Sequence, residues 1–438
     1  MKKRWLCFAT AVTLLLSGCT YTGRNVDSLL HPPMLSDEQK DIIKALKKDN
    51  PEENIKLVYP QRGENRSAIL LTDLDDEPTE EALVFLQPSA TSSNTLIGIR
   101  VLDKSAGKWS LVSELQLDGM QIEDVSILDV GTGTPLLAVG LNYTGDGNHL
   151  LQVMEFKNKK LNTVFSKNYQ VKDYCDLNED GKDDIFIVEN AESEVKTWAR
   201  AYCYEENEFL NMGEVNVNPE ITRYVSITRG NTTKATKALY LDGYKGTELM
   251  STEILSYQNG KLVNLTYDGV IPQKYPVDRA PVVTCWDLTN DGIIEVPGVR
   301  PLPGYEEAEN REDILYLTDW YHFTDTQYEL KNSSYVNTSL NYLLTFPQNW
   351  VGKVSARKTS AENEMMFYEY SLEKTPKETA LLYLRVATRS DWISKKIPDG
   401  YELIDIEGQI VYLAKITDTD SSLKMTITQV KEYFSRIA

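Results

Sequence analysis

A nine-residue stretch with oxygen-bearing side chains at alternate positions is the part of this sequence best suited to chemistry. It runs from Asp176 to Asp184 and reads Asp-Leu-Asn-Glu-Asp-Gly-Lys-Asp-Asp. Hard cations such as Ca²⁺ take about six to eight oxygen ligands, which a short loop supplies only if its acidic residues point inward on a tight turn. Gly181 provides that turn. The spacing predicts a calcium loop, the Asp176 loop, with ligands from Asp176, Asn178, Asp180, Asp184 and the carbonyl of Lys182.

Two further stretches fit the same spacing. In the Asp287 loop a glycine is retained at Gly292, and the ligand positions hold Asp287, Thr289, Asp291 and Glu295. In the Asp73 loop Pro78 replaces the glycine, and the ligand positions hold Asp73, Asp75, Glu77 and Glu81. Proline cannot take a positive φ, so that turn must differ or the site is lost. The sequence ranks the Asp176 loop first and the Asp73 loop last, and ordinary acidic turns are the alternative for all three.

The segments that end in such loops recur along the chain. Loop starts at residues 73, 129, 176, 229 and 287 are 47 to 58 residues apart. A period near 50 with several strands per repeat indicates a propeller or a solenoid. Antiparallel hairpins, as expected at Asn259-Gly260, favour the propeller. We therefore expect a mainly β chain with a propeller-like domain of about five blades. Arg229 and Lys237 stand where carboxylates would be, and basic groups are expected to fill the cation's space in that loop.

The residues after the Asp176 loop exclude one calcium motif and favour another. An EF-hand needs a bidentate Glu at position twelve, where this chain has Ile187, and the segment Ile185 to Val188 reads as a strand. The repeated acidic loop followed by a strand resembles the FG-GAP/VCBS-type repeats of β-propellers. This resemblance implies blades over residues 55–332, with Ca²⁺ as a structural cofactor of the loops.

The first residues have the features of a bacterial export signal. Lys2, Lys3 and Arg4 precede an apolar run of 12 residues, Trp5 to Leu16, which is too short to span a bilayer. The following Leu16-Ser17-Gly18-Cys19 resembles a lipobox. The resemblance implies a signal peptide over 1–18, a lipid such as palmitate on Cys19, and attachment to the extracytoplasmic face of the bacterial cell membrane. An ordinary signal peptide containing a cysteine is the alternative.

The two ends of the remaining chain lack the repeat of acidic loops and strands that marks its middle. Residues 19–54 are predicted to form a tether and a short helix from about Asp37 to Lys48, capped by Ser36 and Gln39. Beyond residue 332 no further acidic loop occurs, and we expect several strands and a final helix within 419–437. The run from Tyr342 to Trp350 resembles the strand and Pro-x-x-Trp turn of Mog1/PsbP-like domains, which implies a small α+β domain over 333–438.

Composition narrows the function. With 65 acidic and 46 basic residues among 438, the net charge is −19, which argues against nucleic acid as a partner. The chain contains no G-x-S-x-G, phosphate-binding or H-E-x-x-H motif, and its histidines, His31, His149 and His322, are far apart. We expect a non-enzymatic binding protein with a protein or carbohydrate ligand. The alternatives are a carbohydrate-active or other envelope enzyme with paired carboxylates, and a structural subunit of an envelope complex with an exposed apolar patch.

Overall fold

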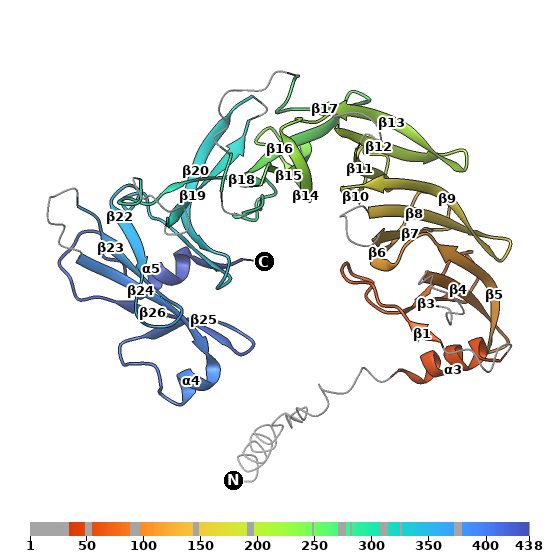
Figure 1. Ribbon diagram of the computed structural model, residues 1–438, viewed down its shortest axis with the longest axis horizontal. Coiled ribbons are helices and arrows are strands. Elements are labelled where there is room, and N and C mark those ends of the chain that lie inside the picture. Colours follow the sequence, from red (N-terminus) through yellow and green to blue (C-terminus); the bar gives the residue numbers. More distant parts are fainter. Residues whose placement is uncertain are drawn as a thin grey trace, which may run out of the picture.

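The protein is described as a computed structural model for residues 35–48, 55–87, 97–142, 149–190, 197–247, 249–269, 277–280, 283–306, 314–324, 326–371 and 379–437. Cys19 and the expected signal peptide lie outside these residues. The described part forms six sheets in which all strand pairs are antiparallel, confirming a mainly β chain. The sheets stand side by side along an open arc (Figure 1). Within the described residues no strand of the first sheet pairs with the last.

Four sheets share the plan of a propeller blade, with the chain passing from the inside of the arc outwards (Figure 1). In the first sheet, β1 and β2 both pair with β3, and β4 and β5 follow; in the next three, four strands pair in chain order. The strands are β1 (Lys56–Leu57), β2 (Ile69–Thr72), β3 (Glu81–Gln87), β4 (Ile97–Ser105), β5 (Lys108–Leu117), β6 (Gln121–Leu128), β7 (Leu136–Asn142), β8 (His149–Lys157), β9 (Lys160–Tyr169), β10 (Val171–Cys175), β11 (Asp184–Asn190), β12 (Thr197–Glu205), β13 (Glu208–Asn216), β14 (Ile221–Asn231), β15 (Lys237–Lys245), β16 (Leu249–Gln258) and β17 (Lys261–Asn264).

The expected hairpin is present at the turn between β16 and β17. Gln258 pairs with Lys261 across two residues with positive φ, Asn259 at 52° and Gly260 at 74°. Such angles suit Asn and Gly, and their twist matches that of the flanking strands. Two-residue turns also join β4 to β5, β8 to β9 and β12 to β13.

The last two sheets depart from this plan. The fifth contains β18 (Glu295–Pro301), β19 (Tyr316–Phe323), β20 (Tyr328–Asn337), β21 (Tyr342–Thr345) and β27 (Phe434–Arg436). The sixth contains β22 (Val354–Lys358), β23 (Glu364–Glu369), β24 (Thr379–Thr388), β26 (Ile410–Ile416) and, at its edge, β25 (Glu402–Glu407). Strand β20 runs across residue 332, so the C-terminal region shares a sheet with the region before it.

The final helix is shorter than the sequence suggested. It is α5 (Ile427–Tyr433), which begins where the Thr426 side chain accepts a hydrogen bond from the Gln429 N–H. It ends where Phe434 turns extended and the chain enters β27. The apolar residues Leu423 and Met425 lie before the helix and pack in the core between the fifth and sixth sheets. An apolar pattern marks buried residues, but it does not by itself require a helix.

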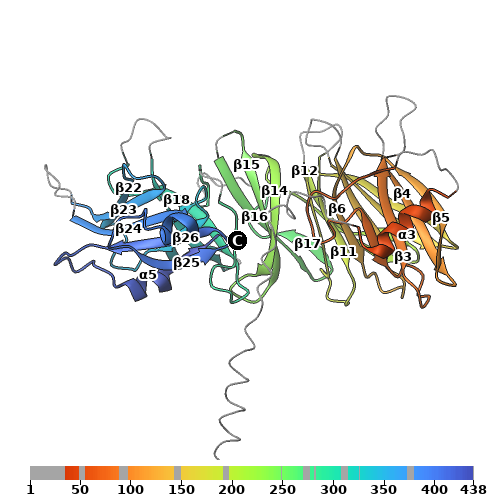
Figure 2. The same ribbon diagram turned by 90° about the horizontal axis from the view of Figure 1, so that it is seen from below.

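The two ends of the arc are covered. At one end, α3 (Asp37–Leu46) has the predicted capping box of Ser36 and Gln39, and buries Ile42 and Leu46 on the first sheet beside Val84 and Leu86 (Figure 2). At the other end, the segment around α4 (Arg389–Ile393) covers the outer face of the last sheet, where its residues meet Val411 and Leu413. Between these ends, apolar cores fill the spaces between successive sheets. Among the described helices, none is long and apolar enough to cross a membrane.

Candidate functional site

The three predicted metal loops share an outer frame. In each, the carboxylate at position nine accepts a hydrogen bond from the backbone N–H at position two. The N···O distances are 2.8 Å for Leu74 to Glu81, 3.0 Å for Leu177 to Asp184 and 2.8 Å for Leu288 to Glu295. The residue at position four has a positive φ in all three loops: Asp76 at 61°, Glu179 at 64° and Asn290 at 55°.

Proline changes the inner part of the Asp73 loop, as expected. In the Asp176 loop, the first aspartate accepts hydrogen bonds from the N–H groups of Asp180 and Gly181, and Gly181 has a φ of 84°. Pro78 has no N–H to donate at the same position, and Asp73 instead accepts from the N–H groups of Asp75 and Asp76. The turn is therefore tightened by two residues while the outer frame of the loop is retained.

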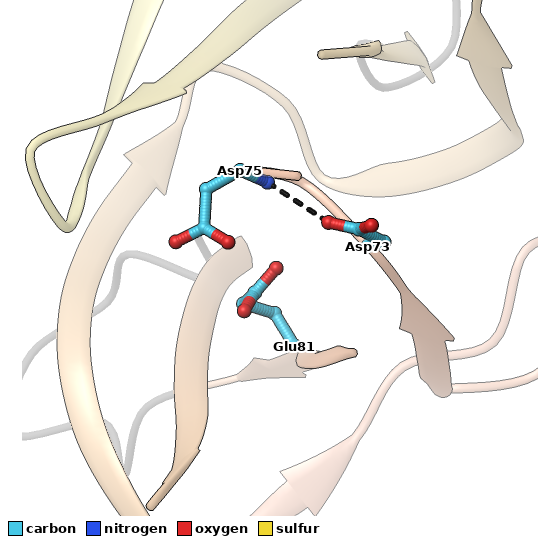
Figure 3. Close-up of side chains that lie close together, drawn as sticks. All are labelled: Asp73, Asp75 and Glu81. Atoms are coloured by element: carbon cyan, nitrogen blue, oxygen red, sulfur yellow. Dashed lines mark hydrogen bonds between the residues drawn. The ribbon is translucent and has the colours of Figure 1, made fainter. Parts of the chain in front are cut away.

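The Asp73 loop brings its carboxylates closest together. One oxygen each of Asp73, Asp75 and Glu81 lies within 4.8 Å of the others (Figure 3). Glu81 is 1% exposed, and its Oε1 is buried without a hydrogen-bond partner. Burial raises the pKa of Glu81 to about 7, and the Leu74 N–H opposes this rise. These residues fit a hard cation, which would supply the missing partner of Oε1. The fourth predicted ligand, Glu77, is exposed and outside this group.

In the other two loops, the carboxylates have different neighbouring groups. In the Asp287 loop, Glu295 Oε1 lies 2.9 Å from His322 Nε2 and accepts from the Thr289 hydroxyl at 3.4 Å. In the Asp176 loop, burial raises the pKa of Asp184 to about 6, and Lys182 Nζ lies 3.3 Å from Asp180 Oδ2. Asn178 and Asp291 each use a side-chain oxygen to accept a loop N–H, from Asp180 and Ile293. The most converged donors thus belong to the loop that the sequence ranked last.

Residues of the second and fourth sheets contact the Asp176 loop and the strand β10 that precedes it. Asp129 and Asp183 exchange hydrogen bonds, with Asp129 N–H donating to Asp183 Oδ2 at 2.9 Å and Asp183 N–H to Asp129 O at 2.7 Å.

The expectation that Arg229 and Lys237 fill a cation's space in their own loop is wrong. Arg229 Nε lies 3.1 Å from Asp173 Oδ2 and Lys237 Nζ 2.9 Å from Glu179 Oε1, so both reach the preceding sheet.

A cleft of about 860 Å³ is lined by strands of the first four sheets, among them β6, β10 and β14, which lie on the inside of the arc (Figure 1). Consecutive residues of β2, β6, β10 and β14 line it, together with residues 62–65, which precede β2. Three cations stand in its wall, in a chain whose net charge is −19: Arg62, Lys172 and Arg229. We call this space the inner cleft.

Each cation of the inner cleft has a carboxylate partner. Lys172 Nζ lies 2.6 and 2.8 Å from the two oxygens of Asp124, and its side chain is 6% exposed. Burial lowers the pKa of Lys172, and Asp124 opposes this change. Arg62 pairs with Glu123, and Arg229 with Asp173. The arginine side chains are 58% and 59% exposed, so much of each guanidinium faces solvent.

A buried polar network supports these pairs. The Tyr169 hydroxyl donates to Glu123 Oε2 at 2.5 Å, and the His149 ring stacks on Tyr169 with centroids 5.2 Å apart. His149 Nδ1 lies 3.0 Å from the same Glu123 oxygen, and burial lowers the pKa of His149. Gly140 makes room for this arrangement, since a Cβ there would lie 2.8 Å from the Tyr169 hydroxyl and 3.0 Å from Asp124 Oδ1. The network therefore holds the charged groups in fixed positions.

Sequence reasoning missed the inner cleft. Its charged residues are far apart in the chain, and only the stacking of successive sheets brings them together. One signal was available: Lys172 and Asp173 interrupt the short strand β10, at a place where the repeat pattern favours apolar residues.

Comparisons with known proteins add little to this description. No protein-family model matches the chain, and neither does any curated sequence. Among solved structures, the exotype rhamnogalacturonan lyase YesX is 11% identical with a TM-score of 0.32, over 73% of each chain. The Dos1 propeller is 12% identical with a TM-score of 0.29, over 83% of this chain and 81% of that one. TolB from Acinetobacter baumannii is 11% identical with a TM-score of 0.25, over 68% and 65%. Scores this low carry no argument about function.

Proposed function

We propose that this chain is a lipid-anchored binding protein of the extracytoplasmic face of a bacterial membrane, without catalytic activity. The inner cleft is the binding site, and its ligand is a protein or a carbohydrate. The observation that supports this most is the cleft of about 860 Å³ with its fixed charge pairs, built from four successive sheets. Ligand pockets of proteins have volumes of roughly 300–1,000 Å³ and carry a few convergent polar groups.

The state of the charges favours binding over catalysis. A guanidinium has five N–H donors, and the carboxylate partners of Arg62 and Arg229 leave several of them for a ligand. Lys172 is held by both oxygens of Asp124, and this ion pair favours its charged form against the effect of burial on its pKa. The site is therefore suited to hold carboxylates or hydroxyls of a ligand in register.

Calcium and lipid complete the proposal. Ca²⁺ in the Asp73 loop would be held by Asp73, Asp75 and Glu81, and would offset the negative charge of these neighbouring carboxylates, of which Glu81 is buried. The Asp176 and Asp287 loops are further candidates for weaker sites. The lipid on Cys19 would fix the arc to the membrane through the residues before α3.

Site-specific photo-crosslinking in cells tests the binding site. A photoreactive phenylalanine at Ser226, which lines the inner cleft, should capture a discrete partner, whereas the same group at the exposed Lys160 of the outer strand β9 should not. Arg62→Gln with Arg229→Gln should reduce capture from position 226. If both positions captured the same material, or if the double variant captured as well as the parent, the inner cleft would not be the binding site.

A further inference from the structure

A second groove, of about 510 Å³, lies on the sixth sheet and shares no lining residue with the inner cleft. It is formed by the end of β24, by α4 and the residues after it, by the turn before β23 and by the segment between β20 and β21. Arg385 stands in its wall, Lys396 is exposed at its edge, and Leu340, Ile397 and Ile410 give it an apolar side. We call it the Arg385 groove.

The Arg385 guanidinium lacks a full set of acceptors. Its side chain is 18% exposed, and its Nε is buried without a hydrogen-bond partner. The carboxylate of Glu364, its neighbour across the strand pair, stays 3.9 Å from Nη1, which is beyond hydrogen-bond distance. A buried donor without an acceptor is unfavourable, and an ionised donor more so.

Glu364 does not move closer because it is engaged elsewhere. It accepts hydrogen bonds from the Thr359 hydroxyl at 2.6 Å and from the Tyr401 hydroxyl. The Tyr401 hydroxyl also interacts with the Arg385 guanidinium, whose Nε still has no partner. On the edge of the groove, Lys396 Nζ lies 2.8 Å from Asp391 Oδ1, with its side chain 69% exposed. The groove thus presents one incompletely satisfied cation beside an apolar wall.

We propose that the Arg385 groove binds a carboxylate carried on an aliphatic group. The planar guanidinium would donate to the carboxylate oxygens, in the bidentate manner that arginine favours. The aliphatic group would pack on Leu340, Ile397 and Ile410. Two sources have this chemistry, the C-terminal residue of a peptide and a free fatty acid.

Titration with matched small acids tests this assignment. The probes are N-acetylleucine, N-acetylleucinamide and octanoate. Their binding to the full chain carrying Cys19→Ser is measured by ligand-observed NMR. We expect saturable binding of at least one acid in the millimolar range, as befits ligands of this size. The amide should bind at least about tenfold more weakly than N-acetylleucine if that acid binds. Tighter binding of N-acetylleucine would indicate a peptide terminus, and tighter binding of octanoate a fatty acid.

Three variants separate binding from folding. Arg385→Gln should weaken binding of the acid at least about tenfold, because a charged hydrogen bond is lost. Glu364→Gln should strengthen it, because the competing negative charge is removed. Lys353→Gln, just before β22 and outside the groove lining, removes an exposed cation of the same region and should leave affinity unchanged. Arg385→Lys covers the case in which Arg385→Gln fails to fold. Equal binding of acid and amide, no saturation by either acid, or unchanged affinity in the folded Arg385 variants would overturn the proposal.

Discussion

Glu81 and Glu295 occupy the same loop position but have different environments. Both are buried and both accept an N–H from the leucine at position two. Glu295 has His322 against its second oxygen, whereas the second oxygen of Glu81 has no partner. Without a cation, burial therefore favours the protonated form of Glu81, and its pKa rises from 4.5 to about 7.

A pH dependence of stability follows for the protein in chelator. A carboxyl whose pKa is higher in the folded state stabilises the fold below its unfolded pKa, and this contribution is lost as the pH rises through its folded pKa. For Glu81 that window runs from about 4.5 to about 7. The melting temperature of Glu81→Gln should therefore fall less than that of the parent between the two ends of this window. Glu77→Gln, an exposed change in the same loop, is the control and should melt in parallel with the parent.

Calcium should restore the stability that the folded protein loses when Glu81 ionises at neutral pH. An ion at 100 times its dissociation constant stabilises the folded state by about 2.7 kcal/mol. We expect a saturable calorimetric heat and a raised melting temperature, both reduced in Asp73→Asn with Asp75→Asn. Asp176→Ala with Asp180→Ala tests the Asp176 loop separately. The absence of heat and of any shift at millimolar calcium would mean that all three loops are ordinary acidic turns.

At the scale of single residues, the sequence predicted the three loops, but not which of them brings its carboxylates closest together. The alternation of oxygens gave the frame shared by Asp73, Asp176 and Asp287, because loop hydrogen bonds are local. It could not show that His322 reaches Glu295, since these residues meet only across β18 and β19. The partners of a buried carboxylate are a tertiary property.

The helix α3 is the element whose role is clearest. A single sheet has two faces, and the first sheet packs one of them on the second sheet through Leu83, Phe85 and Ile99. Its other face has no neighbouring sheet, and α3 covers it with Ile42 and Leu46, which are 0% and 3% exposed. The helix therefore acts as the terminal cap that repeat arrays require.

Truncation of the cap should destabilise the first sheet. Ile42→Ala removes a fully buried side chain and should cost about 2–5 kcal/mol, measured by urea unfolding. Lys44→Ala, on the exposed side of the same helix, should change stability little. Hydrogen exchange would locate the loss, with faster exchange in β3 and β4. Equal effects of the two changes would show that α3 is not packed as described.

The sequence predicted this helix well and the last one poorly. The Ser36 and Gln39 capping box and the spacing of Ile42 and Leu46 fixed α3 from local signals. The C-terminal apolar residues instead serve three environments, the approach to α5, the helix itself and β27. The sequence predicted that these residues are buried. It could not predict where the helix ends and β27 begins, because β27 pairs Phe434 with Leu344, 90 residues away in the chain.

The whole molecule is an arc of sheets, and α3 covers the end that comes first in the chain. The repeat period predicted separate sheets, and the five loop starts correspond to the first five of them. It could not predict whether the sheets close, since closure depends on the angle between neighbours. The sixth sheet lacks the loop signal because its first hairpin turns through Thr359 to Asn363, which contain no aspartate.

Attachment to the membrane is tested by Cys19→Ala. If the lipobox interpretation is right, the variant should lose its lipid and appear in the soluble fraction after cell breakage, while Cys7→Ala should remain with membranes. Incorporation of a labelled fatty acid measures the modification directly. A Cys19→Ala protein that stays with membranes and matures normally would contradict the anchor.

Covered ends also bear on how such a protein could change over generations. In a closed ring, duplicating one unit alters every angle around the circle, so the number of units is hard to vary. In this arc, α3 and the segment around α4 end the array independently of its length. A duplicated sheet in the middle would extend the inner wall without disturbing either terminus. Chains descended from the same ancestor are therefore expected to differ in the number of their sheets while keeping both coverings.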